Sequence, residues 1–114
     1  MDKNIKFYLE HILESILLLE EYTKGYSRED FLNSIKLQDL VCRRLEIIGE
    51  AVKNLPESFK NIHTDVEWRK IAGMRNYLIH EYFGIDYKLT WNVIQKNLPE
   101  LKEKINNIMK KQNI

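Results

Sequence analysis

Apolar residues recur along most of the chain at intervals of three and four positions, which is the pattern of helices with one buried face. Residues 3–24 follow this pattern, and Gly25 is predicted to close the segment. A second helix is predicted to start after Ser27, which can cap it, and to run for about 27 residues, or roughly 40 Å, to Pro56. The apolar positions of these two helices are Ile5, Leu9, Ile12, Leu13, Ile16, Leu17, Leu19, Phe31, Ile35, Leu40, Val41, Leu45, Ile48 and Val52.

The second half of the chain carries several boundary signals. Residues 56–63 form a predicted connector with one short helical turn. The residues Thr64 to Glu67 have the form of a capping box and predict a helix of roughly five turns from about residue 65 to 83, with Gly84 as its left-handed stop. Asp86 can cap the next helix, and Pro99 predicts a break and a restart before the last one.

These segments leave no alternating strand pattern, internal repeat or Gly-rich phosphate loop. The chain of 114 residues has only four glycines and two prolines, which favours long helices over many turns. We therefore expect one domain, residues 1–114, folded as an all-α, up-and-down bundle of four to five helices.

Composition limits the function classes. A net charge of +1 does not indicate nucleic-acid binding by itself, so such binding would need a local basic patch. The single Cys42 excludes an internal disulfide and a multi-cysteine zinc site, and no spacing typical of metal ligands is present. No apolar run is long enough to span a bilayer and no signal peptide is recognisable, so a cytoplasmic protein without membrane contact is expected.

One glycine lies inside the predicted second helix, where it lowers helix propensity. Gly49, with Ala51 close by, therefore predicts a close approach of two helices. Arg44 and Glu50 flank this glycine and are expected to pair with neighbours at the contact.

Polar side chains gather on the helix predicted for residues 65–83. Arg75 and His80 are about 140° apart around the helix axis, so the two side chains flank a common face. Tyr82 falls on the stripe of Arg75, and Asn76 falls on the stripe of His80. The edge thus offers a fixed cation, a titratable imidazole and two groups that can form hydrogen bonds.

The sequence from Arg75 to His80 resembles the Arg-x4-His motif of HEPN domains, including the polar residue that often follows the arginine. Three more segments occur in the same order as in the HepT-like toxins of that family: residues 44–51, residues 68–74, and His80-Glu81-Tyr82 followed by Ile85-Asp86 and Trp91. The motif alone is weak, whereas the ordered set covers nearly the whole chain.

This resemblance implies a metal-independent endoribonuclease toxin that needs no cofactor, acts as a homodimer and is paired with a nucleotidyltransferase antitoxin. The residue types fit RNA cleavage, because histidine can take or give a proton near neutral pH and arginine matches phosphate oxygens. Two chains would supply two copies of His80, one as acid and one as base. Asn76 is expected to orient either the imidazole or the phosphate, beside Arg75.

The resemblance also gives Tyr82 a regulatory role, because the tyrosine of Arg-x4-His-x-Tyr is the site where the partner transferase attaches AMP in HepT-like toxins. A nucleotide on the Arg75 stripe would occupy the space that a substrate phosphate needs. The alternative for Tyr82 is an ordinary aromatic residue at a helix end.

Other residues have structural interpretations. His11 and His63 are expected to be structural or solvent-exposed, and Cys42 to be a small apolar residue rather than a nucleophile. Residues expected to pack in the core or an interface are Met74, Tyr77, Leu78, Trp68 and Trp91.

Two rival functions remain open. Related helical bundles serve as non-catalytic substrate-binding or assembly partners of small nucleotidyltransferases, and such a module could keep Arg75 and His80 for nucleotide phosphate. A purely structural dimerising bundle is the third interpretation, and it leaves the polar edge unexplained.

Overall fold

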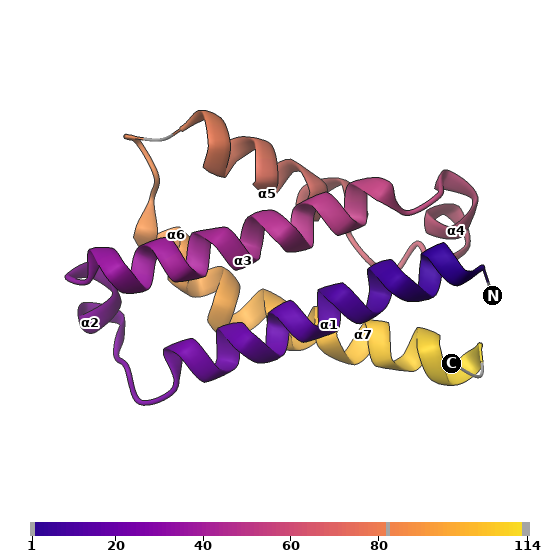
Figure 1. Ribbon diagram of the computed structural model, residues 1–114, viewed down its shortest axis with the longest axis horizontal. Coiled ribbons are helices and arrows are strands. Elements are labelled where there is room, and N and C mark those ends of the chain that lie inside the picture. The colour runs from indigo at the N-terminus through magenta and orange to yellow at the C-terminus, as the bar shows by residue number, and fades with distance from the viewer. Residues whose placement is uncertain (1, 82, 113–114) are drawn as a thin grey trace.

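The computed structural model of the protein describes residues 2–81 and 83–112, which form an up-and-down helical bundle (Figure 1). Short helices α2 (Arg28–Leu32) and α4 (Glu57–Ile62) connect the long segments. The described residues contain no strand, so the predicted all-α bundle is confirmed. The four long segments are α1 (Lys3–Thr23), α3 (Ile35–Asn54), α5 (Trp68–His80) and a continuous run of α6 (Tyr87–Asn92), the π-helical η1 (Val93–Asn97) and α7 (Leu98–Lys111).

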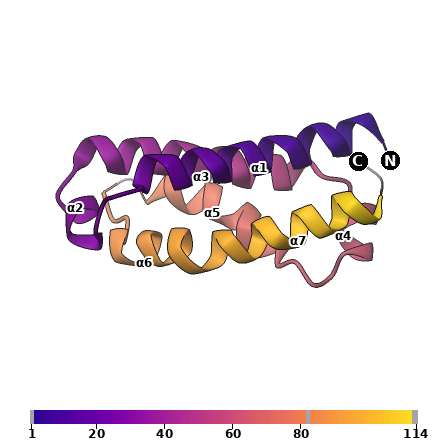
Figure 2. The same ribbon diagram turned by 90° about the horizontal axis from the view of Figure 1, so that it is seen from below.

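The most deeply buried side chains come mainly from α1, α3 and α7. They are aliphatic and recur at helical spacing on each element, so the three stripes close on one another. Figure 1 shows α3 between α1 and α5, and Figure 2 shows α7 running along α1 from below. The fully buried members are Leu9, Ile12, Ile16, Leu19, Val41, Leu45, Ile48, Val52 and Ile105.

The predicted second helix is interrupted, so its length was wrong. Asn33 ends α2, and the Ser34 hydroxyl accepts a hydrogen bond from the Leu37 N–H at 3.1 Å to begin α3. The Gln38 amide then donates to the carbonyls of Phe31 at 3.0 Å and Leu32 at 3.2 Å, which ties the end of α2 to the first turn of α3. Asn and Ser side chains compete with helical hydrogen bonds, which explains why the chain breaks at these two residues.

Helix α5 starts later than predicted. The Thr64–Glu67 segment forms a turn rather than a capping box, and the N-cap has no side-chain hydrogen bond. The Trp68 indole donates to the His63 carbonyl at 2.8 Å, and the adjacent Val66 is buried. These contacts hold the segment before Trp68 as a turn against the core.

Helix α5 also ends earlier than predicted, at His80 instead of near residue 83. The Glu81 N–H still donates to the Tyr77 carbonyl, and a turn follows in which the Gly84 N–H donates to the Glu81 carbonyl. Gly84 does not adopt positive φ, so its predicted role as a left-handed stop was wrong. Among the described glycines, positive φ occurs at Gly25, where the first helix closes as predicted.

The predicted break at Pro99 is absent, and that prediction was wrong. The Leu98 N–H donates to the Val93 carbonyl five residues earlier, so the helix widens by a π turn and continues. Pro99 sits in the first turn of α7, directly after this widening. Pro99 has no N–H to donate within the helix, and the π turn shifts the hydrogen-bond pattern just before it, so the helix continues past the proline. The predicted cap of α6 by Asp86 is confirmed by bonds from Lys88 and Leu89 at 3.1 Å.

On the side of α5 that faces α6 and α7, two hollows remain. One has a volume of about 210 Å³ and lies between α5 and α7. The other has a volume of about 300 Å³ and lies among α5, α3 and α6. Met74 and Val93 line both hollows, and Ile71 lines the first.

Candidate active site

The motif arginine lies where α5 comes closest to α3. A Cβ placed on Gly49 would be 2.8 Å from the Arg75 Cβ and 3.1 Å from both the Arg75 amide nitrogen and the Ile71 carbonyl oxygen. No larger residue fits there without movement of the backbone. The close approach predicted from Gly49 is therefore confirmed, and its partner is the backbone at Arg75.

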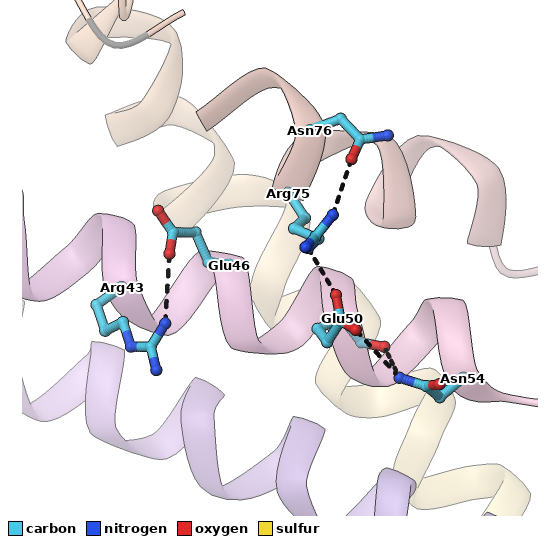
Figure 3. Close-up of polar contacts among 6 residues, drawn as sticks. All are labelled: Arg43, Glu46, Glu50, Asn54, Arg75 and Asn76. Atoms are coloured by element: carbon cyan, nitrogen blue, oxygen red, sulfur yellow. Dashed lines mark hydrogen bonds and ion pairs between the residues drawn. The ribbon is translucent and has the colours of Figure 1, made fainter. Parts of the chain in front are cut away.

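The guanidinium of Arg75 is bound on two sides (Figure 3). Its Nε lies 2.6 Å from Oε2 of Glu50, and its Nη1 donates to Oδ1 of the neighbouring Asn76 at 3.2 Å. The Arg75 side chain is 32% exposed and that of Glu50 is 48% exposed, so the pair lies at the surface. The expectation that Glu50 pairs at the helix contact is confirmed, whereas Arg44 makes no hydrogen bond or ion pair with any described residue.

His80 is the last residue of α5 and is exposed. Within residues 2–81 and 83–112, His80 makes no hydrogen bond or ion pair, so its two ring nitrogens remain accessible. The structure brings Arg75, Asn76 and Glu50 together, and it holds His80 on the same helix without direct contact to Arg75.

A hollow of about 340 Å³ opens beside Arg75 among α1, α3 and α5. The α1 wall is aromatic: the Phe7 ring is 54% exposed and its centroid lies 4.4 Å from that of His11. On the α3 wall, Arg43 forms an ion pair with Glu46 at 3.5 Å. Each arginine of the hollow is thus paired with a glutamate of α3, so its formal charges balance.

Tyr82 lies outside the described residues. The Tyr77 hydroxyl accepts a hydrogen bond from the Asp86 N–H at 2.8 Å. Phe83 is 98% exposed. Tyr77 thereby connects the last turn of α5 to the cap of α6.

The remaining predictions for single residues are mostly confirmed. Trp68, Trp91 and Leu78 are buried, and Met74 and Tyr77 pack against the core while partly exposed. Burial raises the pKa of the Cys42 thiol to about 11, and the carboxylates of Glu46 and Asp39 add to this shift. A thiol with this pKa is a poor nucleophile near neutral pH, as expected for a structural cysteine.

The two other histidines lie partly buried against phenylalanine rings, His11 beside Phe7 and His63 at 4.7 Å from Phe59. Sequence reasoning missed that His11 belongs to the hollow that contains Arg75. The available signal was the pair Phe7 and His11 at helical spacing on one face of α1.

Within the part of the chain that the structure describes, no group of three or more His, Cys, Asp or Glu residues is arranged to hold a metal ion. In the same part, no helix is both long and apolar enough to cross a bilayer.

An all-α bundle that carries Arg-x4-His at the end of a surface helix defines a HEPN-type helical domain with a candidate ribonuclease site. Residues 12–108 match the model of the HepT-like ribonuclease family. The chain therefore belongs to the HepT-like family, which is a family of ribonucleases.

Three relatives cover nearly the whole chain. A Thermococcus cleftensis protein named as a ribonuclease HepT is 46% identical over 96% of this chain and 100% of its own length. A Caldanaerobacter subterraneus protein named as a proposed RNase is 50% identical over 92% of this chain and 94% of its own length. A Methanocaldococcus jannaschii protein, named as a gamma-glutamylcyclotransferase and proposed RNase, is 54% identical over 96% of this chain. This chain spans 49% of the length of that last protein. No solved structure matches the chain.

Proposed function

We propose that the chain is a metal-independent endoribonuclease toxin of a toxin–antitoxin pair, with Arg75, Asn76 and His80 as its catalytic residues. The observation that carries this proposal is the Arg75 guanidinium, held at the surface by Glu50 and Asn76 with Nη2 left without a partner among the described residues, on the same helix as an exposed His80. A fork of donors beside an imidazole suits a phosphodiester.

The proposed reaction is an internal transfer within RNA. One His80 takes the proton of a 2′-hydroxyl, the 2′-oxygen attacks phosphorus, and the bond from phosphorus to the 5′-oxygen breaks. A second His80 gives a proton to the departing 5′-oxygen. The products are a 2′,3′-cyclic phosphate and a 5′-hydroxyl, while Arg75 stabilises the negative charge that grows on the phosphoryl oxygens.

This scheme needs two imidazoles and each chain offers one in the motif, so we infer a homodimer whose two α5 helices share one cleft. The exposed apolar side chains Phe7 and Ile79 beside Arg75 support this inference, because such side chains are suited to burial between chains. Sedimentation of the purified protein at micromolar concentration should show a dimer. A monomer that cleaves RNA would contradict the shared cleft.

The test of the chemistry is cleavage of a labelled RNA by the wild type and by His80→Ala and Arg75→Ala. Each substitution should lower the rate by about 1,000-fold or more, because each removes a group of the transition state. Activity should persist in EDTA. The control is Arg69→Ala, which removes an exposed cation from the same helix and should leave cleavage unchanged.

Three outcomes separate the alternatives. RNA binding without any cleavage by the wild type would favour a non-catalytic binding partner of a nucleotidyltransferase. Loss of activity in EDTA that magnesium restores would replace the metal-independent scheme. Equal loss in Arg69→Ala would mean that general positive charge, rather than the motif, supports the reaction.

We further propose that a nucleotidyltransferase antitoxin silences the toxin at Tyr82. The Tyr82 phenolic oxygen would attack the α-phosphorus of ATP, with loss of its proton and release of pyrophosphate. The attached AMP adds negative charge and bulk two residues after His80, where it would compete for Arg75 and repel RNA.

Tyr82→Phe removes the acceptor oxygen and keeps the ring. The variant should cleave RNA like the wild type, gain no AMP mass with the transferase and ATP, and escape silencing. Modification and silencing equal to the wild type would place the acceptor elsewhere. Loss of cleavage in the variant alone would instead give the Tyr82 hydroxyl a part in catalysis.

A further inference from the structure

Two contacts orient the guanidinium of Arg75: an ion pair with Glu50 and a hydrogen bond to Asn76. They leave some of its N–H donors without a partner among the described residues. Arginine has five N–H donors in a planar fork. Nε lies 2.6 Å from Oε2 of Glu50 in an ion pair, and one Nη1 N–H donates to Oδ1 of Asn76 at 3.2 Å. Nη2 has no partner among the described residues, so it remains available to a phosphate oxygen together with the second Nη1 N–H.

Glu50 is itself held in place. The Asn54 amide, one helical turn further along α3, donates to the Glu50 main-chain carbonyl at 2.9 Å and to its Oε1 at 3.4 Å. Oε2 is the oxygen that binds Arg75, so both carboxylate oxygens have a partner (Figure 3). Gly49 immediately precedes Glu50 and brings the backbone at Arg75 into contact with α3. The short distance therefore rests on a fixed helix contact and on a fixed carboxylate.

A second arginine–glutamate pair on α3 provides an internal comparison. Arg43 and Glu46 are on the same helix and line the same hollow, yet their atoms are 3.5 Å apart and the Arg43 side chain is 72% exposed. No described residue braces Glu46 as Asn54 braces Glu50. An ordinary surface ion pair has this looser form, whereas the Glu50–Arg75 bond joins two helices.

We propose that Glu50 is the positioning residue of the motif arginine: it fixes the guanidinium through Nε so that the Nη edge faces the scissile phosphate. This inference rests on the proposed ribonuclease function. A preset guanidinium does not have to be ordered during the reaction, so the contribution of Glu50 appears in kcat more than in KM.

The same bond could act in the opposite sense. If Glu50 occupied the place of the phosphate, it would have to leave before RNA could bind, and its removal would raise activity. The geometry opposes this, because the Glu50 carboxylate lies on the Nε side of the guanidinium, while Nη2 has no partner among the described residues. The two senses predict opposite changes in rate.

The experiment measures kcat and KM for RNA cleavage by Glu50→Ala, Glu50→Gln and the matched control Glu46→Gln. We expect Glu50→Ala to lower kcat about 100-fold with little change in KM, since small misplacement of a catalytic group costs that much. Glu50→Gln keeps an oxygen that can accept the Nε–H, so its kcat should fall only about tenfold. Glu46→Gln should match the wild type.

A second measurement detects the contact between Glu50 and Arg75 without depending on RNA cleavage. In a ¹H–¹⁵N spectrum of arginine side chains, the Nε–H signal of Arg75 should be protected from exchange in the wild type. It should also be protected in Glu46→Gln and lost in Glu50→Ala. Melting temperatures of all three variants show whether the fold persists, and the isosteric Glu50→Gln keeps the test decisive if Glu50→Ala is unstable.

The outcomes are separable. If the wild type cleaves, Arg75→Ala does not, and Glu50→Ala cleaves as fast as or faster than the wild type, the positioning role is overturned while the ribonuclease proposal stands. If the wild type does not cleave RNA at all, the proposed function fails and the positioning role fails with it.

Discussion

Helix α5 meets its neighbours in two different ways. On the α3 side, its backbone at Arg75 lies so close to Gly49 that there is no room for a methyl group. On the α6 and α7 side, Met74 and Val93 line hollows of about 210 and 300 Å³. The motif arginine belongs to the tight side. The position of the candidate site is therefore set by one helix contact, while the opposite side can adjust without moving Arg75.

The helix that carries the candidate site also differs from the core helices in how deeply its side chains are buried. The fully buried aliphatic side chains belong to α1, α3 and α7, and α5 contributes the less deeply buried Trp68 and Leu78. An element whose side chains are less deeply buried gains less free energy from packing, in spite of its close backbone contact with α3. We expect α5 to detach before the other long helices, so that site geometry is lost before the bundle unfolds.

The largest effect is expected from a side chain added at Gly49, where α3 and α5 are in close contact. Gly49→Val should lower the free energy of unfolding by about 3 kcal/mol, because its Cβ and two methyl groups meet the Arg75 Cβ and the backbone of α5 rather than the far end of a flexible side chain. Gly49→Ala should cost about 1 to 2 kcal/mol, since better helix propensity offsets part of the clash. Chemical denaturation measures both. Cleavage should fall with stability, because Arg75 moves.

Gly73 supplies the control on the same helix as Arg75. A Cβ added there meets nothing within 4 Å. Gly73→Ala should therefore stabilise the protein by about 0.5 to 1 kcal/mol through helix propensity alone. If Gly49→Ala also stabilised the protein, the close contact would not constrain the position of α5.

A second substitution tests the packing of α5 against α6 and α7. Met74→Ala should cost about 1 kcal/mol, because Met74 is partly exposed and already borders space. Ile48→Ala, in the fully buried stripe of α3, should cost about 3 to 4 kcal/mol. Equal losses measured by denaturation would mean that both sides of α5 are packed alike.

The features that the sequence predicted correctly are those that depend on the spacing of apolar residues and on single glycines. The long amphipathic helices, the turn at Gly25 and the contact at Gly49 all follow from local patterns and steric size. The resemblance located Arg75 and His80 on one helix. The break at Asn33-Ser34 was missed because the apolar period continues through it, and because the bond from Gln38 back to Phe31 spans seven residues.

Other features depend on contacts distant in sequence. The start of α5 is decided by the Trp68 indole and its bond to His63. The end of α5 was misjudged because Gly84 has the residue type of a helix stop but not the conformation. The partner of Glu50 could be named only when α3 and α5 were placed side by side, since Arg75 is 25 positions further along the chain.

The smallest expected effect comes from Cys42, which lies two helical turns before Gly49 on the same face of α3. Its pKa is raised from 9.0 to about 11, so its thiolate fraction at pH 8, and its alkylation rate, should be about 100-fold below that of the unfolded chain. Gly49→Val should speed alkylation if α5 detaches. Mass spectrometry over time gives the rate.

The same pKa shift fixes a pH dependence. A group whose pKa is raised on folding contributes stability that is present below the unfolded value and is lost as pH rises through the folded value. Stability should therefore decline between pH 9 and about 11, and Cys42→Ala should remove that part of the decline. An unchanged decline in Cys42→Ala would assign it to other groups.

The alternating directions of the four long segments place the start of α1 and the end of α7 at the same end of the bundle, opposite the turn between α5 and α6 (Figures 1 and 2). A second polypeptide joined at either end would thus emerge far from His80. This arrangement suits the domain to fusion, and the Methanocaldococcus relative, about twice as long, shows that nature has used a similar segment within a larger protein. Fluorescent or affinity partners can be attached at both ends in the same way, with the turn after His80 left open to macromolecules in solution.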